Sequence, residues 1–161
     1  MPRSTLAAAL APIFAAALVA APALAHDHGD HALAVVPAEE KARAQELLAD
    51  GPTETKGIGG VEVIGTVSLD GEFDSSDGLM MRVRDLIILP GGIVAVHQHT
   101  NRPGAAYIIE GELVEHRSSE PAPIVKTAGS TAMERSGVIH WWENESDAPA
   151  RALVVDIVPA E

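Results

Sequence analysis

The sequence contains no cysteine. Disulfide bonds are therefore excluded, and stability has to come from the hydrophobic core or from oligomerisation. Positive charge is also scarce: 11 lysine and arginine residues stand against 23 aspartate and glutamate residues, which gives a formal net charge of −12. Such a charge repels phosphate backbones and anionic membrane surfaces, so we expect no nucleic-acid partner.

Charge is absent from residues 5–25, a stretch rich in alanine that follows Arg3. It ends in Ala23-Leu24-Ala25, the small-x-small pattern that signal peptidase accepts, and a polar segment begins at once. We therefore expect residues 1–25 to be a cleaved signal peptide and the mature protein to be periplasmic or secreted, with no membrane span after cleavage. The alternative is an uncleaved membrane anchor, against which the alanine content and the cleavage pattern argue. Because no cysteine follows this stretch, we expect no lipoprotein anchor.

Histidine is concentrated in the segment after the expected cleavage site, a polar tail over residues 26–36. Cleavage after Ala25 would leave His26-Asp27-His28 at the N-terminus. A free amine with histidine as the third residue can bind Cu(II) or Ni(II) in a square plane, which makes His26 and His28 a secondary candidate metal site. The alternative is a solvated tail whose histidines have no role.

The remainder of the chain divides into a short helical part and a long β part. Residues 37–50 are strong helix formers that begin at a proline and end before Gly51-Pro52, and residues 57–60 form a flexible connector, so that helix and linker occupy 37–60. The predicted strands are 61–67, 80–89, 93–99, 105–109, 113–116, 123–127, 138–142 and 152–158, with a turn at 90–92. Many short strands bounded by glycine or proline indicate one β-sandwich or β-barrel over residues 61–161.

Two histidines, His97 and His99, are the clearest chemical feature. They lie two residues apart on a predicted strand, so their side chains point to the same face of the sheet. The apolar residues Ile93 and Ala95 share this phase, which suggests that the face points inwards. Two imidazoles on one face can chelate a metal ion; the alternative is a pair of surface histidines.

The spacing around these histidines resembles the cupin family. The first cupin motif has glycine, His-x-His, glutamate and glycine at set intervals, and here Gly91, His97, His99, Gly104 and Gly111 stand at those positions.

The second cupin motif has glycine, proline, glycine, histidine and asparagine. Here Gly129, Arg135, Gly137, His140 and Asn144 stand at those positions. Both motifs occur in the expected order, and the resemblance covers residues 80–158. It implies an all-β, single-domain cupin jelly-roll barrel with a short N-terminal helix.

The resemblance also implies a metal centre, because cupins usually bind one metal ion through three histidines and one glutamate. Three of these ligands carry over, namely His97, His99 and His140. The fourth position is Gly104, which has no side chain. Either the centre uses three histidines and leaves coordination positions open, or metal binding is weakened and the barrel binds another ligand.

Three further residues are candidates for the substrate pocket. Trp142 shares the inward phase of His140 and either forms a pocket wall or belongs to the core. Arg135 and Arg102 lie in loops near the histidines and either hold a substrate carboxylate or are solvated turn residues. The phase of Glu134 and Glu143 predicts that they point elsewhere, so no general base is assigned.

Two functions remain open. One is a metal-dependent enzyme, for example of the dioxygenase type, that acts on a small polar substrate with one divalent ion, iron first and Mn, Ni, Cu or Zn as alternatives. The other is a periplasmic module that binds metal or a small ligand without turnover. A purely structural role for buried histidines is a third reading. Cupins often dimerise, so the resemblance also implies a homodimer.

Overall fold

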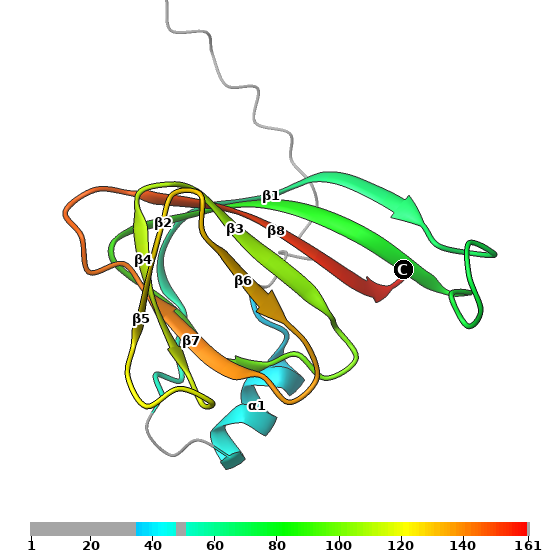
Figure 1. Cartoon of the computed structure of the whole chain (residues 1–161), viewed down its shortest axis with the longest axis horizontal. Coiled ribbons are helices and arrows are strands. Elements are labelled where there is room, and N and C mark those ends of the chain that lie inside the picture. The colour runs from blue at the N-terminus through cyan, green and yellow to red at the C-terminus, as the bar shows by residue number, and fades with distance from the viewer. Residues whose placement is uncertain (1–34, 48–50, 161) are drawn as a thin grey trace, which may run out of the picture. The chain divides into compact units, whose positions relative to one another are not determined.

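The computed structural model describes residues 35–47 and 51–160. In chain order the elements are α1 (Ala38–Leu47), β1 (Lys56–Ser68), β2 (Leu79–Gln98), β3 (Gly104–Glu110), β4 (Glu112–Arg117), β5 (Ile124–Thr127), β6 (Thr131–Glu134), β7 (Ile139–Glu143) and β8 (Ala150–Pro159) (Figure 1). The predicted signal peptide and the tail residues His26 and His28 lie outside the described residues. Among those described, no helix has the length and apolar character needed to cross a membrane.

The strands pair in the order β5-β4-β7-β2-β8-β3-β6, and β1 pairs with β2. All of these pairings are antiparallel. The first half of β2 lies between β1 and β8, whereas its second half pairs with β7. Because one long strand takes part in both halves of the structure, the strands wrap into a nearly closed barrel. The predicted all-β barrel with one short helix is confirmed.

The predicted turn at residues 90–92 is wrong, because β2 continues through it as one strand. Gly91 has a φ of 70°, which lets the strand bend without ending. A Cβ atom on Gly92 would lie 2.6 Å from the backbone oxygen of Gly57, so close packing against β1 requires glycine here. The predicted connector 57–60 is not a linker, because these residues belong to β1.

Strand β6 was not predicted. It has only four residues, yet its side chains alternate strictly: Thr131 and Met133 are exposed, whereas Ala132 and Glu134 are buried. It pairs with β3, with Gly104 directly opposite Glu134. This pairing decides which way Glu134 points and matters for the site below.

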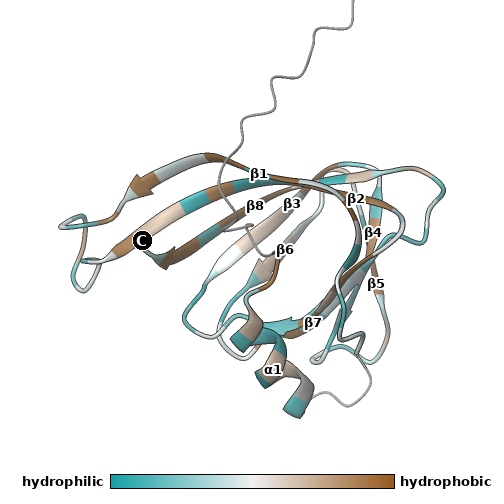
Figure 2. Ribbon diagram, turned by 180° about the vertical axis from the view of Figure 1, so that it is seen from behind, coloured by the Kyte–Doolittle hydropathy of each residue, from teal (hydrophilic) through white to brown (hydrophobic). Residues whose placement is uncertain are grey.

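The core consists of inward side chains from both halves of the barrel. Ile88, Ile108 and Trp142 are among its largest members, and Val36 from the segment before α1 joins them. Val36 is the last residue of the predicted tail 26–36. Figure 2 shows hydrophobic and hydrophilic residues following one another along the strands, as expected for strands with one buried face.

Candidate metal centre

The three predicted ligands lie together inside the barrel. His97 stands near the end of β2, His99 follows this strand directly, and His140 is on β7. His97 and His140 are register partners, so their side chains lie on the same face of the sheet. All three are buried, with exposures of 4%, 1% and 0% respectively.

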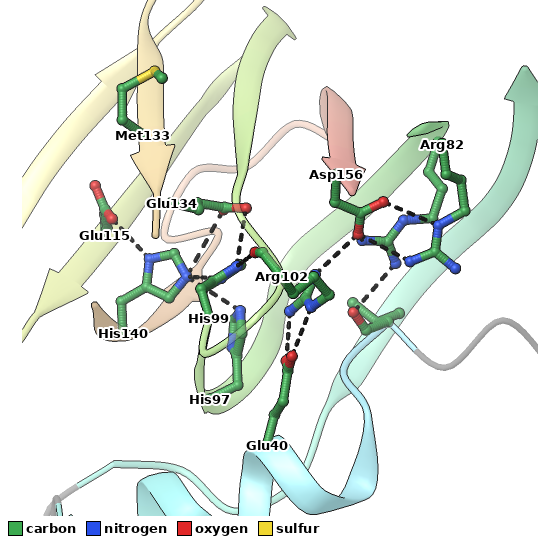
Figure 3. Close-up of polar contacts among 12 residues, drawn as sticks. Glu40, Arg82, His97, His99, Arg102, Glu115, Met133, Glu134, His140 and Asp156 are labelled. Atoms are coloured by element: carbon green, nitrogen blue, oxygen red, sulfur yellow. Dashed lines mark hydrogen bonds and ion pairs between the residues drawn. The ribbon is translucent and has the colours of Figure 1, made fainter. Parts of the chain in front are cut away.

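The imidazole rings point their Nε2 atoms at one another (Figure 3). Nε2 of His140 lies 2.9 Å from Nε2 of His99 and 3.1 Å from Nε2 of His97. Metal–nitrogen bonds of about 2.1 Å at right angles place neighbouring nitrogens about 3 Å apart. The observed spacings match this value, so the three rings fit around a single ion.

Hydrogen bonds on the opposite side of each ring fix the protonation of these nitrogens. Nδ1 of His97 contacts the carbonyl oxygen of Ala95 at 2.8 Å, and Nδ1 of His99 contacts that of Arg102 at 3.2 Å. Nδ1 of His140 lies 2.8 Å from Oε1 of Glu115. These oxygens can only accept, so each Nδ1 carries the hydrogen and donates it.

Burial keeps all three rings neutral. It lowers the pKa of His97 well below the ordinary value, with the neighbouring histidines adding to the effect, and it lowers the pKa of His99 to about 2. It also lowers the pKa of His140, although the hydrogen bond to Glu115 opposes the shift. A neutral ring with its hydrogen on Nδ1 has a lone pair on Nε2. Three lone pairs therefore converge on one point, an arrangement that a cation stabilises.

Glu115 on β4 is a positioning residue that the sequence did not reveal. It is fully buried, and it accepts hydrogen bonds from His140 and from Nε of Arg117 at 2.8 Å. Burial raises the pKa of this carboxyl group, but these two partners outweigh it and lower the pKa overall. Glu115 is thus an anion that orients His140 and increases the basicity of its ring.

The three predicted pocket residues lie in different environments. Trp142 is buried, and its ring centroid lies 5.6 Å from that of His140. Arg102 is also buried, but its guanidinium donates to both carboxylate oxygens of Glu40 and to Asp156, so it is occupied by the protein itself. Arg135 is exposed in the turn after β6, because Glu134 takes the inward position beside it and strand neighbours point in opposite directions.

A cavity of about 40 Å³ lies beside the histidines. His97, His99, Arg102 and Trp142 are in its wall, and Arg135 is not. The other lining residues are mostly apolar: Val35, Val61, Leu86, Ile88, Val94, Ala106, Ile108, Leu113, Ala152 and Val154, with Arg84 and Glu134 as further polar members. This volume holds on the order of three water molecules.

Asn144, the last residue of the second motif, fixes the loop after β7. Its side-chain nitrogen donates to the carbonyl oxygens of Ile88 and Ala148 at 2.9 and 2.8 Å, and its Oδ1 accepts from Ser146. Its backbone also bonds with Gly91 and Gly92. The loop is thereby attached to the bend in β2, which leads to His97.

Residues 85–156 match the cupin domain family. Both sets of metal-ligand positions fall inside this range, and the three histidines meet in the barrel. This part of the chain is a cupin domain. No curated protein sequence matches it.

Several solved structures are similar to this chain over part of its length. A predicted oxalate decarboxylase from Thermotoga maritima is 23% identical, with 50% of this chain and 80% of that chain covered and a TM-score of 0.44. A protein from Thermus thermophilus is 31% identical, with coverages of 50% and 74% and a TM-score of 0.44. The cupin domain of an XRE family transcriptional regulator from Enterobacter cloacae is 14% identical, with coverages of 65% and 99% and a TM-score of 0.48.

This cupin departs from the usual ligand set at Gly104, and the structure explains why no side chain is present there. A Cβ atom on Gly104 would lie 2.5 Å from the backbone oxygen of Val155 and 3.2 Å from Asp156. Strand β8 approaches β3 too closely for any larger residue. A glutamate at this position would require β8 to move.

Glu134 points into the barrel, towards the histidines. Its expected direction, away from the site, is wrong: the side chain is buried, and it lies beside His99 and His140 (Figure 3). Oε2 is 3.5 Å from Nδ1 of His99, and Oε1 is 3.8 Å from Nε2 of His140. Burial raises the pKa of Glu134 to about 7, against the opposing effect of Arg102 and Arg84. The sequence feature that indicates this inward direction is the two-residue spacing of Glu134 from Ala132, which places both on one face of the strand. Four residues are too few for the strand to be recognised.

Proposed function

We propose that this cupin binds one divalent metal ion through Nε2 of His97, His99 and His140. The observation that carries the proposal is the convergence of three buried, neutral imidazoles whose Nδ1 atoms are already committed to oxygen acceptors. Without a cation, three lone pairs would face one another in a buried site. Imidazole nitrogens suit Fe, Mn, Ni, Cu and Zn, and iron is our first expectation.

The bound ion would supply Lewis acidity and, if it is iron, a site for oxygen chemistry. We propose a dioxygenase-type reaction on a small polar substrate. The protein's own part is to orient the ligands through Glu115 and to exclude water with Trp142 and the apolar wall. Arg102 is no free anchor for a substrate anion, because Glu40 and Asp156 already occupy it.

The small cavity favours a second candidate, a cupin that holds metal or a small ligand without turnover. About 40 Å³ admits a substrate of only a few heavy atoms unless side chains move. The two candidates are distinguished by the metal in the purified protein and by oxygen uptake. Iron in the purified protein, together with oxygen uptake on addition of small organic acids, alcohols or ketones, supports the enzyme. Stoichiometric Zn, Ni or Cu, with no oxygen uptake across the same panel, supports the binding module.

We also propose that the protein is exported and that residues 1–25 are removed. The support is the uncharged alanine-rich stretch and the cleavage pattern at Ala23-Leu24-Ala25. N-terminal sequencing of the protein from a periplasmic fraction should begin at His26. A start at any other residue would also remove the proposed Cu(II) or Ni(II) site at His26 and His28.

We propose a homodimer as the working assembly, which light scattering of the purified protein tests.

A further inference from the structure

Glu134 occupies the place that Gly104 leaves without a ligand. The two residues are direct register partners on β6 and β3. Side chains of opposed residues in an antiparallel pair lie on the same face of the sheet, so the Glu134 carboxyl group reaches the side of the barrel on which a residue 104 side chain would lie. Gly104 cannot carry a side chain itself, because Val155 is too close.

The carboxyl group is also incompletely bonded. Oε2 of Glu134 is buried and has no hydrogen-bond partner among the described residues. A buried, unpartnered carboxylate oxygen is costly, and such atoms often mark a bound ion or a functional role. Oε2 lies 3.5 Å from Nδ1 of His99, and the other oxygen, Oε1, lies 3.8 Å from Nε2 of His140, so the carboxyl group lies beside the histidine cluster with Oε1 on the side of the metal-binding nitrogens.

The distances suit a ligand that completes the set when an ion is bound. Oε1 of Glu134 lies 3.8 Å from Nε2 of His140. Adjacent ligands of an ion with bonds of about 2.1 Å lie about 3 Å apart at right angles, so a shift of about 0.8 Å brings this oxygen into range.

The surrounding charges leave Glu134 available. The buried arginines that face it, Arg84 and Arg102, are paired with Asp156, and Arg102 is paired with Glu40 as well. Three neutral imidazoles would leave a divalent ion without a counter-charge in a buried site. A carboxylate in direct contact with the ion removes this cost.

We infer that Glu134 is the fourth protein ligand of the metal centre, supplied from β6 in place of the side chain that position 104 lacks. This inference rests on the proposed three-histidine site and extends it. It predicts a centre with three nitrogen donors and one carboxylate, in which the anion comes from a different strand.

The test measures metal binding rather than activity. Untagged metal-free protein is titrated with Zn(II) in competition with a chelator, and its Co(II) derivative is examined by visible absorption. Glu134→Gln should weaken Zn(II) binding by about 100-fold or more, at or beyond the upper end of the 10–100-fold loss typical of residues outside the coordination shell. It should also change the Co(II) absorption bands, because the carboxylate donor is lost. Glu134→Asp, which keeps the charge but shortens the side chain, should show a smaller loss.

Glu143→Gln is the matched control, since Glu143 is a partly buried glutamate on β7 that bonds with His116 at 2.7 Å, and it should leave both readouts unchanged. Circular dichroism of each metal-free variant checks folding. If Glu134→Gln keeps the wild-type affinity and Co(II) spectrum, or loses affinity with an unchanged spectrum, Glu134 is not a ligand and the inference fails while the three-histidine site stands. If His97→Ala/His140→Ala binds Zn(II) as the wild type does, the proposed site itself fails.

Discussion

Replacing Glu40 by glutamine should destabilise the protein strongly, although Glu40 lies on a short helix outside the barrel. Glu40 receives hydrogen bonds from Nε and Nη2 of Arg102, and the side chains of both residues are less than 10% exposed. The pair joins α1 to the loop that follows β2. Burial opposes the charge of Arg102, but Glu40 and Asp156 raise the pKa of Arg102 overall, which shows how strongly the guanidinium depends on these partners.

The size of the effect follows from what remains after the substitution. Removing one member of a buried ion pair costs about 3–5 kcal/mol, because the other charge stays buried without its partner. Arg102 keeps a bond of 3.0 Å to Asp156, so we expect the lower end, about 3 kcal/mol. Proteins of this size have a free energy of unfolding of about 5–15 kcal/mol, so the loss is a large fraction of the total.

Urea unfolding of the metal-free protein at neutral pH measures this difference. The midpoint should fall for Glu40→Gln with an unchanged slope. Glu39→Gln changes an exposed acidic residue of the same helix and should stay within about 0.5 kcal/mol of the wild type. A Glu40→Gln protein as stable as the Glu39→Gln control would refute the view that this ion pair holds α1 in place.

Three further predictions concern the barrel. Gly104→Ala should lower the free energy of unfolding by about 1–3 kcal/mol in urea, because its Cβ would clash with the Val155 backbone; an unchanged value would contradict the close approach of β8. Asn144→Ala should cost about 1–3 kcal/mol in the same assay, since the buried carbonyl of Ile88 loses its donor, and a neutral effect would mean that the loop holds without it. Acid should destabilise the metal-free protein: below about pH 6.5 the unfolded chain protonates His97 and His99, which the folded state keeps neutral, and the lowered pKa of His140 adds to this effect, whereas Glu134, with its pKa raised to about 7, retains one proton on folding and offsets one of them. The net difference of at least one proton predicts that stability falls by about 1.4 kcal/mol or more per pH unit between about pH 6 and 4.5, and unfolding free energies independent of pH in this window would contradict the neutral histidines.

Local spacing was sufficient to single out His97 and His99, whereas His140 was assigned through the resemblance to the second cupin motif. His97 and His99 are two residues apart on one strand, and the second motif places His140 in a strand of its own. Alternation along a strand then decides that Trp142 points inwards with His140, as observed. The barrel follows in the same way from short strands bounded by glycine and proline.

The features that were missed depend on contacts between distant parts of the chain. The direction of Glu134 follows from the pairing of β6 with β3, and four residues carry too little pattern to reveal a strand. Arg102 looked free to hold a substrate because its partner Glu40 is 62 residues away. The Pro-Gly-Gly sequence at 90–92 is typical of a turn, but β2 continues past it, because Ile88 and Ile93 on either side of it both pair with β1 across a register shift. Each of these outcomes is set by tertiary packing, which local propensity does not contain.

The metal content of the untagged protein shows whether the three histidines of the barrel hold an ion. Elemental analysis of the wild type and of His97→Ala/His140→Ala, both prepared in the same medium, compares the barrel site with everything else, because the histidines of the N-terminal tail are present in both. We expect one divalent ion per chain in the wild type and the loss of this ion in the double variant. Equal metal content in the two proteins, or a wild type that takes up no metal, would contradict it.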